Sequence, residues 1–368
     1  MANMTTATNK LQYLPFEEKI AALDRRIEDL NRIAAREGVD NSGEIRRIQR
    51  EQTTELGKLY ANLTPWQTVQ VSRHPQRPLL QDYLNYMVKD ARELHGDRCF
   101  GDDTAIVTAL GQIGRERVMV IGQEKGRDTN EKIACNFGCP NPEGYRKALL
   151  KMKLAEKFNL PIVTIIDTPG AFPGVGAEER GQAQAIAVNL MEMSRLRVPI
   201  ISIVIGEGGS GGALGIGVAD KLAILEYAYY SVITPEGCAG ILWHDGSQAP
   251  AAAEALKLTS KHLLSLGIVD AIIPESLGGA HRNVHDTVHN VEHYVVKTLR
   301  DLKRTKIENL LTNRYKKLRA IGEPSQKVLR DKQTVEKTYL PNRLSAALLL
   351  EDAKKHTPVA QQVHAPNP

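Results

Sequence analysis

Four short apolar runs rich in β-branched residues constrain the fold of this chain more than any other feature. They occupy residues 104–110, 117–122, 160–167 and 198–206, and glycine-rich or helical stretches separate them. The last two runs are apolar at nearly every position, which is typical of parallel strands buried on both faces. Each of these two runs opens directly into a loop that carries glycines. Alternating strands and helices predict an α/β core with a site at the strand ends.

Helical patterns flank this core on both sides in the sequence. One apolar stripe predicts a helix over residues 15–36 that ends at Gly38, and a second predicts a helix that ends near Thr64. The two form a helical hairpin, and residues 285–318 read as one or two further helices. Because the stripes carry no cluster of titratable groups, we expect them to pack on the core or on a partner subunit. The stripes consist of Phe16, Ile20, Leu23, Ile27 and Leu30, then Ile45, Ile48, Leu56, Leu59 and Leu63.

The sequence predicts five segments. The central one is the α/β core, and the final stretch is polar and proline-bearing, which is typical of disordered chain. The segments are a flexible N-terminus (1–9), an N-terminal helical region (10–100), the core (101–280), C-terminal helices (281–322) and a largely disordered tail (323–368).

Charge, hydropathy and cysteine content exclude several classes of protein. Lys and Arg exceed Asp and Glu by only 5, which is too small a balance for a dedicated nucleic-acid binder. The sequence has neither a signal pattern nor an apolar run near the ~20 residues that span a bilayer, so we expect no membrane partner and a cytoplasmic location. Four cysteines fit a reducing compartment, and the single C-x3-C of Cys135 and Cys139 favours a structural role over zinc binding.

The glycine-rich segment over residues 205–220 is the most informative part of the sequence. A buried strand runs into five glycines within seven residues and then into an apolar helical pattern. Glycines let the backbone approach a ligand closely, and consecutive amides at such a turn can stabilise a developing oxyanion. Backbone amides are therefore the expected catalytic groups.

Three other interpretations of this segment remain open at the level of pattern. Gly206, Gly208 and Gly211, with Glu226 20 residues on, match a dinucleotide fingerprint, although glycine-dense loops satisfy that loose pattern by accident. A glycine-rich turn used only for close packing is the second. The third is a G-x-S-x-G nucleophile elbow around Ser210, whose partners would be His244, Asp245, His262 and Asp270.

A second loop, over residues 165–182, follows the preceding buried strand. Its Asp167-Thr-Pro-Gly170 resembles the D-x-x-G of a GTPase, but the chain contains no G-x-x-x-x-G-K-[ST] to hold phosphates, which excludes a GTPase. Prolines make this loop stiff, and its glycines let the backbone approach a ligand closely. Its charged residues Glu178, Glu179 and Arg180 favour a solvated first turn of a helix.

Longer motifs in collinear order resemble one family. DTPGAFPGVGAEERGQ, VIGEGGSGGALGIGV and YSVITPEGCAGILW, supported by ARELHGDRCFGDDTAIV, IGQEKGRDT, NFGCPNPEGYRKAL and IIPESLGGAHRN, resemble the acetyl-CoA carboxylase carboxyltransferase alpha subunits of the crotonase superfamily. The resemblance covers roughly residues 10–322. It implies an α/β, crotonase-like (ClpP/crotonase) core of ββα units with an N-terminal helical hairpin and C-terminal helices.

The resemblance also implies an activity and a set of partners. The family transfers the carboxyl group of carboxybiotin, held on the biotin carboxyl carrier protein, to acetyl-CoA to give malonyl-CoA, the first committed step of fatty acid synthesis. It implies an α2β2 heterotetramer with a beta subunit and contact with the biotin carboxylase complex. Zinc is expected only in the beta subunit, because this chain has no C-x2-C pair. A serine hydrolase using Ser210 and a non-catalytic crotonase-like assembly subunit are the alternatives.

The site residues follow from the same resemblance. The family assigns a pair of glycine amides to the biotin oxyanion, and Gly208 and Gly209 match that pair. The thioester enolate is assigned mainly to the beta subunit. We expect substrate contacts in the two glycine loops, from Gly170, Phe172, Gly174, Val175, Gly176 and Gly211.

Overall fold

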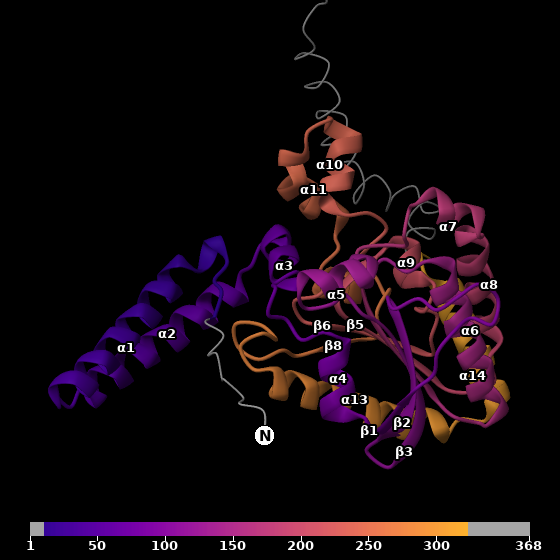
Figure 1. Ribbon diagram of the computed structural model, residues 1–368, viewed down its shortest axis with the longest axis horizontal. Helices are drawn as coiled ribbons and strands as arrows, with labels where there is room; N and C mark the ends of the chain where they lie inside the picture. Colours follow the sequence, from indigo (N-terminus) through magenta and orange to yellow (C-terminus); the bar gives the residue numbers. More distant parts are fainter. Residues whose placement is uncertain (1–10, 323–368) are drawn as a thin grey trace, which may run out of the picture. The chain divides into compact units, whose positions relative to one another are not determined.

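A mixed β-sheet lies at the centre of the computed structural model, which describes residues 11–322 (Figure 1). In this range the strand order is β1-β2-β3-β4-β5-β6-β8, and β7 pairs with the end of β5. The first three strands are antiparallel, whereas the pairings from β3 onward are parallel. The strands are β1 (Lys89–Glu93), β2 (Ile106–Ile113), β3 (Glu116–Gln123), β4 (Ile162–Thr168), β5 (Ile200–Gly209), β6 (Lys221–Leu225), β7 (Tyr229–Ser231) and β8 (Ala271–Ile273).

Helices connect the strands and extend the chain at both ends of the described range. The α-helices are α1 (Glu18–Glu37), α2 (Ser42–Ala61), α3 (Pro65–Ser72), α4 (Leu80–Met87), α5 (Thr129–Ala134), α6 (Pro142–Lys157), α7 (Val175–Glu179), α8 (Gln182–Arg195), α9 (Ser210–Leu214), α10 (Pro235–Trp243), α11 (Ala249–Leu256), α12 (Ser260–Ser265), α13 (Val284–Lys303) and α14 (Ile307–Ala320). Short 3-10 helices are η1 (Pro15–Glu17), η2 (Asn136–Gly138) and η3 (Gly246–Gln248). No helix between residues 11 and 322 is long and apolar enough to cross a membrane.

The four predicted strands are β2, β3, β4 and β5. Every residue of β4 and of β5 is buried, and the two strands pair in parallel from Ile162 opposite Ile200 onward. The prediction of buried parallel strands is therefore confirmed, because side chains on both faces of these strands meet packed helices or loops. β5 extends to Gly209, three residues beyond the apolar run that predicted it.

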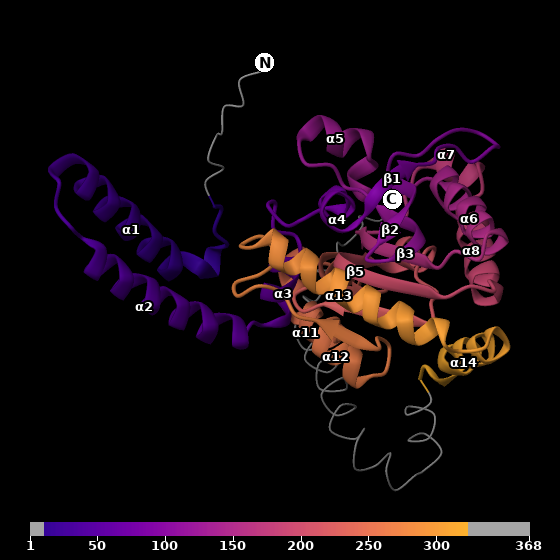
Figure 2. The same cartoon turned by 90° about the horizontal axis from the view of Figure 1, so that it is seen from below.

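The N-terminal hairpin forms as predicted. α1 ends at Gly38, whose φ of 70° is the left-handed conformation that glycine adopts readily. α1 and α2 lie side by side (Figures 1 and 2), and the base of the hairpin packs through Ile20, Leu56 and Tyr60 against Val71 of α3. α3 in turn packs against β5, β7 and α11.

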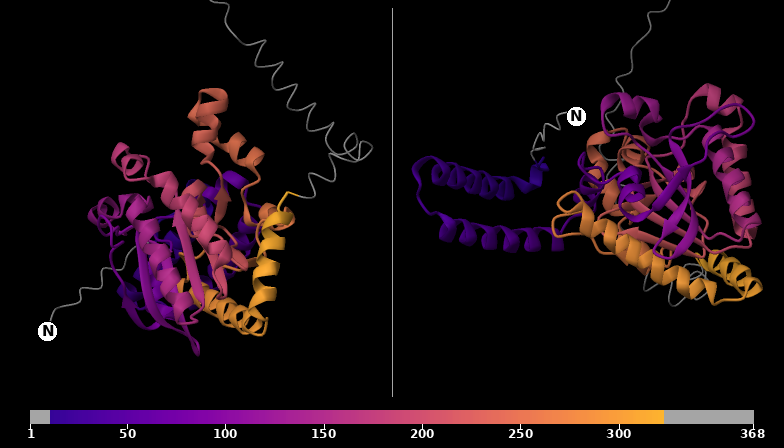
Figure 3. Two further views of the ribbon diagram at one scale, coloured as in Figure 1. Left: turned by 90° about the vertical axis from the view of Figure 1, so that its right-hand side faces the viewer. Right: turned by 60° about the horizontal axis from the view of Figure 1, so that its bottom comes forward.

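The predicted C-terminal helical region forms two helices, α13 and α14. α13 lies across the sheet and contacts β2, β5 and β8 (Figures 2 and 3). In α14 the guanidinium of Arg314 is fully buried and binds both carboxylate oxygens of Asp220, at 2.8 and 2.7 Å. It also donates to the carbonyl oxygens of Met193, Leu196 and Val198, so it satisfies backbone groups that would otherwise be buried without partners.

The chain forms one compact unit as far as Lys316, and α14 ends four residues later, at Ala320. β1 lies inside the range 10–100 predicted as helical, so that range also supplies an edge strand of the sheet. The division into segments at residues 100, 280 and 322 stays a prediction. The predicted flexible N-terminus (1–9) and disordered tail (323–368) lie outside the described residues.

Candidate functional site

The two glycine loops predicted from the sequence meet at the carboxyl ends of β4 and β5. Thr168, the last residue of β4, is the register partner of Gly208, and Gly209 is the last residue of β5. A Cβ atom added to Gly209 would lie 2.1 Å from the carbonyl oxygen of Pro169, and one added to Gly212 would lie 2.4 Å from the carbonyl carbon of Gly170. Only glycine permits this approach, because every other residue carries the Cβ atom that would overlap backbone.

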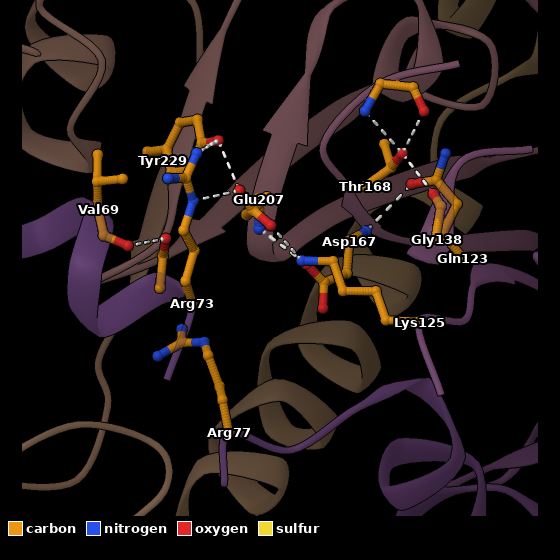
Figure 4. A network of polar contacts seen from close by, with 12 residues as sticks. Val69, Arg73, Arg77, Gln123, Lys125, Gly138, Asp167, Thr168, Glu207 and Tyr229 are labelled. Atoms are coloured by element: carbon orange, nitrogen blue, oxygen red, sulfur yellow. Dashed lines mark hydrogen bonds and ion pairs between the residues drawn. The ribbon is translucent and has the colours of Figure 1, made fainter. Parts of the chain in front are cut away.

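Polar side chains hold the two loops in this arrangement. Gln123 of β3 accepts a hydrogen bond from the amide of Asp167 at 3.1 Å and donates to the carbonyl of Gly212 at 2.8 Å. The Thr168 hydroxyl accepts from the amide of Gly170 at 3.0 Å and lies 2.6 Å from the carbonyl oxygen of Gly138 (Figure 4). Side chains of the sheet strands therefore fix the positions of the two loops.

A buried network of charged side chains surrounds Glu207, the residue before the glycine pair (Figure 4). Its carboxylate binds Arg73 Nε at 2.6 Å, Lys125 Nζ at 2.6 Å and the Tyr229 hydroxyl at 2.8 Å. Lys125 Nζ also lies 2.7 Å from Asp167 Oδ1, which accepts the amide of Glu207 at 2.9 Å. Both carboxylate oxygens of Glu207 are thus occupied by donors, and its backbone is held as well.

The ionisation of this network follows from its charges. Burial alone would raise the pKa of Glu207, but the adjacent Lys125 and Arg73 outweigh it and lower that pKa to about 2. Burial would likewise lower the pKa of Lys125, yet Asp167 and Glu207 raise it above its ordinary value. Glu207 and Lys125 are therefore both charged at neutral pH.

The candidate residues of the second loop divide into two groups. Gly170 lies against the glycine pair and Gly212, and Gly211 follows within α9. Gly174, Val175 and Gly176 lie instead at the start of α7: a Cβ on Gly174 would meet the Phe172 ring at 2.4 Å, and one on Gly176 would meet Arg180 at 3.1 Å. Val175 is exposed. The structure therefore gathers only part of the predicted substrate-binding set around Gly208 and Gly209.

Arg180 is more than a residue of a solvated first turn. Its guanidinium donates to the buried Glu143 at 2.6 Å and stacks over the Phe100 ring at 4.5 Å. Arg180 therefore attaches the end of α7 to α6, which is a structural role that the sequence pattern did not predict.

Ser210 does not stand in a hydrolase triad. It adopts a φ of 49°, a strained conformation for a non-glycine residue that nucleophile elbows share. The cavity beside it, of about 210 Å³, is lined by Gly211, Leu214, Tyr230, Ser231, Val232, Leu263 and Ile268, without a histidine or carboxylate among them. His262, one proposed partner, makes its ring contact with Thr259 at 2.9 Å instead. The structure thus does not favour the hydrolase.

Local packing contacts also explain the glycines of the dinucleotide pattern and Cys135 of the possible zinc pair. Gly206 and Gly208 lie inside β5 rather than in a turn, and a Cβ on Gly206 would meet the Asp167 carboxylate at 2.6 Å. Cys135 is buried and its thiol contacts the carbonyl oxygen of Thr104 at 3.6 Å. Between residues 11 and 322, no group of three or more His, Cys, Asp or Glu side chains could hold a metal ion.

Comparison with known proteins gives one consistent result. A family model described as acetyl co-enzyme A carboxylase carboxyltransferase-like matches residues 13–322. The acetyl-coenzyme A carboxylase carboxyl transferase subunit alpha of Rhodopirellula baltica is 52% identical over 310 residues, which cover 84% of this chain and 97% of that protein. The subunit of the same name from Saccharophagus degradans is 52% identical over 312 residues, 85% of this chain and 98% of that protein.

Among solved structures, a Pseudomonas malonate decarboxylase hetero-tetramer in complex with coenzyme A matches with a TM-score of 0.50 and 18% identity, over 63% of this chain and 93% of that one. This likeness concerns the fold alone. The mixed α/β sheet with helices at both ends confirms the predicted crotonase-like architecture. From the family model and the relatives, the chain belongs to the acetyl-CoA carboxylase carboxyltransferase alpha subunit family.

Proposed function

We propose that this chain supplies the biotin side of a carboxyltransferase site, in which the backbone amides of Gly208 and Gly209 stabilise negative charge on the biotin ureido oxygen. The observation that carries the proposal is the contact between the two loops: the strand end at Gly209 and the segment 169–170 approach so closely that no side chain fits between them. Rigid, closely packed backbone is the kind of preorganised donor that an oxyanion requires.

Carboxybiotin would supply the carboxyl group that replaces one α-hydrogen of acetyl-CoA: its N–C bond and an α C–H bond break, a C–C bond forms, and the proton passes to the biotin nitrogen. The two fixed amides would stabilise the negative charge on the ureido oxygen more than they stabilise the neutral ground state. The residues of this chain bind and orient that group. The cavity of about 210 Å³ beside Gly211 is lined by Leu214, Tyr230, Val232 and Leu263, and this lining suits the apolar part of biotin and its chain.

The proposal includes the partners that the family implies. A beta subunit with its own zinc ribbon would stabilise the thioester enolate, in an α2β2 assembly served by the biotin carboxyl carrier protein and biotin carboxylase. Exposed apolar side chains at the cavity and on α10 support a covering partner: Val232, which lines the cavity, is 76% exposed, and Ile241 and Leu242 of α10 are 67% and 63% exposed. All four cysteines are free, which supports a location in the reducing cytoplasm.

Reconstitution tests this function. The purified chain alone should not transfer a carboxyl group, and addition of a zinc-ribbon beta subunit should restore both carboxyl transfer and malonyl-CoA decarboxylation in the presence of biotin. The reason is that the reaction develops two oxyanions, whereas this chain offers one pair of loops for them. Full carboxyl transfer by the isolated chain would refute a shared site. A beta subunit equally active without this chain would instead identify a non-catalytic assembly subunit.

A further inference from the structure

Arg73 lies at the end of α3, in the N-terminal region for which packing and assembly were the predicted roles. We propose that Arg73 is a positioning residue for carboxyl transfer: through Glu207 it fixes the glycine pair, and through Glu236 it attaches α10 to the same strand. This inference rests on the proposed function of Gly208 and Gly209. It assigns to α3 a role in the site that no sequence motif indicated.

Arg73 and its neighbours hold the carboxylate of Glu207 at the end of β5. Arg73 Nε lies 2.6 Å from Glu207 Oε1, and the Tyr229 hydroxyl lies 2.8 Å from the same oxygen, while Lys125 holds the other oxygen at 2.6 Å. A carboxylate bonded at both oxygens cannot rotate freely. Because the carbonyl group of Glu207 and the amide of Gly208 belong to one planar peptide, anchoring Glu207 also restricts the orientation of that amide.

Arg73 also contacts α10 through Glu236. Arg73 Nη1 lies 2.5 Å from Glu236 Oε1, and Nη2 lies 3.1 Å from the Tyr229 hydroxyl. Glu236 stands in the first turn of α10, whose far end carries the exposed Ile241 and Leu242. The planar fork of arginine spreads its donors widely enough to reach two carboxylates and a hydroxyl, whereas the compact ammonium group of lysine would keep part of this contact set. Arg73 thus connects an exposed apolar helix with the residue that precedes the glycine pair.

The same chain offers a matched control. Arg282 Nη2 lies 2.9 Å from Glu17 Oε1, and the Tyr60 hydroxyl donates to that oxygen at 3.0 Å. Like Arg73 at Glu207, Arg282 pairs with a buried glutamate that also accepts from a tyrosine, but this set lies at the base of the hairpin. Loss of either arginine leaves a buried glutamate with a tyrosine partner. Only the Arg73 set adjoins the glycine pair.

The test uses the complex reconstituted with a beta subunit and compares Arg73→Met, Arg73→Lys and Arg282→Met in single-turnover carboxyl transfer. We expect Arg73→Met to lower the rate by about tenfold or more, as misplacement of a catalytic group does. The acetyl-CoA concentration that gives half the maximal single-turnover rate should change less than about twofold, since the thioester enolate is assigned mainly to the beta subunit. The rate of Arg73→Lys should lie between those of Arg73→Met and the wild type, and Arg282→Met should keep the wild-type rate.

Two further readouts separate positioning from general stability. The double variant Arg73→Met/Glu207→Gln should be no slower than Glu207→Gln alone, because Arg73 affects the glycine pair through Glu207, whereas its contact with Glu236 only attaches α10. Loss of the Arg73 charge should also move the acid limb of the pH–rate profile to higher pH, since Lys125 alone would then hold Glu207 ionised among Asp167 and Glu236.

The outcomes distinguish this inference from the proposed function. If Arg73→Met keeps the wild-type rate while Gly209→Ala is inactive, the inference is wrong and the glycine pair stands. Equal losses in Arg73→Met and Arg282→Met, or fully multiplicative losses in the double variant, would also overturn it. If Gly209→Ala retains full activity, the proposed function itself fails.

Discussion

Replacement of Gly209 by alanine is the most direct test of the glycine pair. The added Cβ would lie 2.1 Å from the carbonyl oxygen of Pro169 and 2.3 Å from its carbonyl carbon. Ordinary C···O contacts begin near about 3.3 Å. The end of β5 and the segment after β4 must therefore separate by about 1 Å, and since both contacting atoms are backbone, no side-chain rotation relieves the overlap.

This displacement predicts the size of the kinetic effect. An amide that donates at 2.7–3.1 Å in a transition state loses most of its bond when it moves by about 1 Å, and loss of one such donor costs about 10²- to 10³-fold in rate, or about 2.7–4 kcal/mol. The assay is single-turnover carboxyl transfer with the beta subunit present. Ser210→Ala, one residue along, removes no amide and should stay within about tenfold of wild type.

A control accounts for lost stability. Gly122→Ala in β3 places a buried Cβ 2.4 Å from Leu80 Cδ1, the movable end of a side chain, so it should cost some unfolding free energy and little activity. The reasoning is refuted if Gly209→Ala keeps more than about a tenth of the wild-type rate. An inactive Ser210→Ala beside an active Gly209→Ala would point to a serine nucleophile instead.

Three further predictions follow from other parts of the chain. Arg314→Met removes both guanidinium bonds to the buried Asp220 and should lower the unfolding free energy by about 3–5 kcal/mol in urea titrations. Glu207, with its pKa lowered to about 2, contributes stability above about pH 4.5 that is lost as pH falls towards 2, so Glu207→Gln should lose less unfolding free energy over that range. Truncation after Gly322 should leave transfer within about tenfold of wild type, because the family model ends there.

The strands and the two loops could be predicted from the sequence because their signals are local. A run that is apolar on both faces, such as 160–167 or 198–206, has few ways to be buried other than as a central parallel strand. Parallel strands bring their carboxyl ends to one edge, so a site at the strand ends could be predicted. The contact of Gly209 with the segment 169–170 is a detail that the structure adds.

The charged network could not be predicted in the same way. Arg73 and Glu207 are 134 residues apart, and nothing around Arg73 distinguishes it from a solvated residue at the end of a helix. Glu207 did carry a signal, since a carboxylate inside a fully buried strand needs partners, but the signal does not say which residues they are. The exposure of Val175 on α7 could not be predicted either, because it depends on how the loop turns after Gly174, and its role in substrate binding stays a prediction.

The composition of the network bears on how an oxyanion can form beside it. Three carboxylates, Asp167, Glu207 and Glu236, surround two cations, Arg73 and Lys125. An unpaired carboxylate next to the glycine pair would repel a developing negative charge, and a low-dielectric interior strengthens that repulsion. Because each oxygen of Glu207 faces a cation at 2.6 Å, its charge is largely neutralised locally. The two cations therefore allow a fixed, ionised anchor to stand beside amides whose proposed task is to bind an anion.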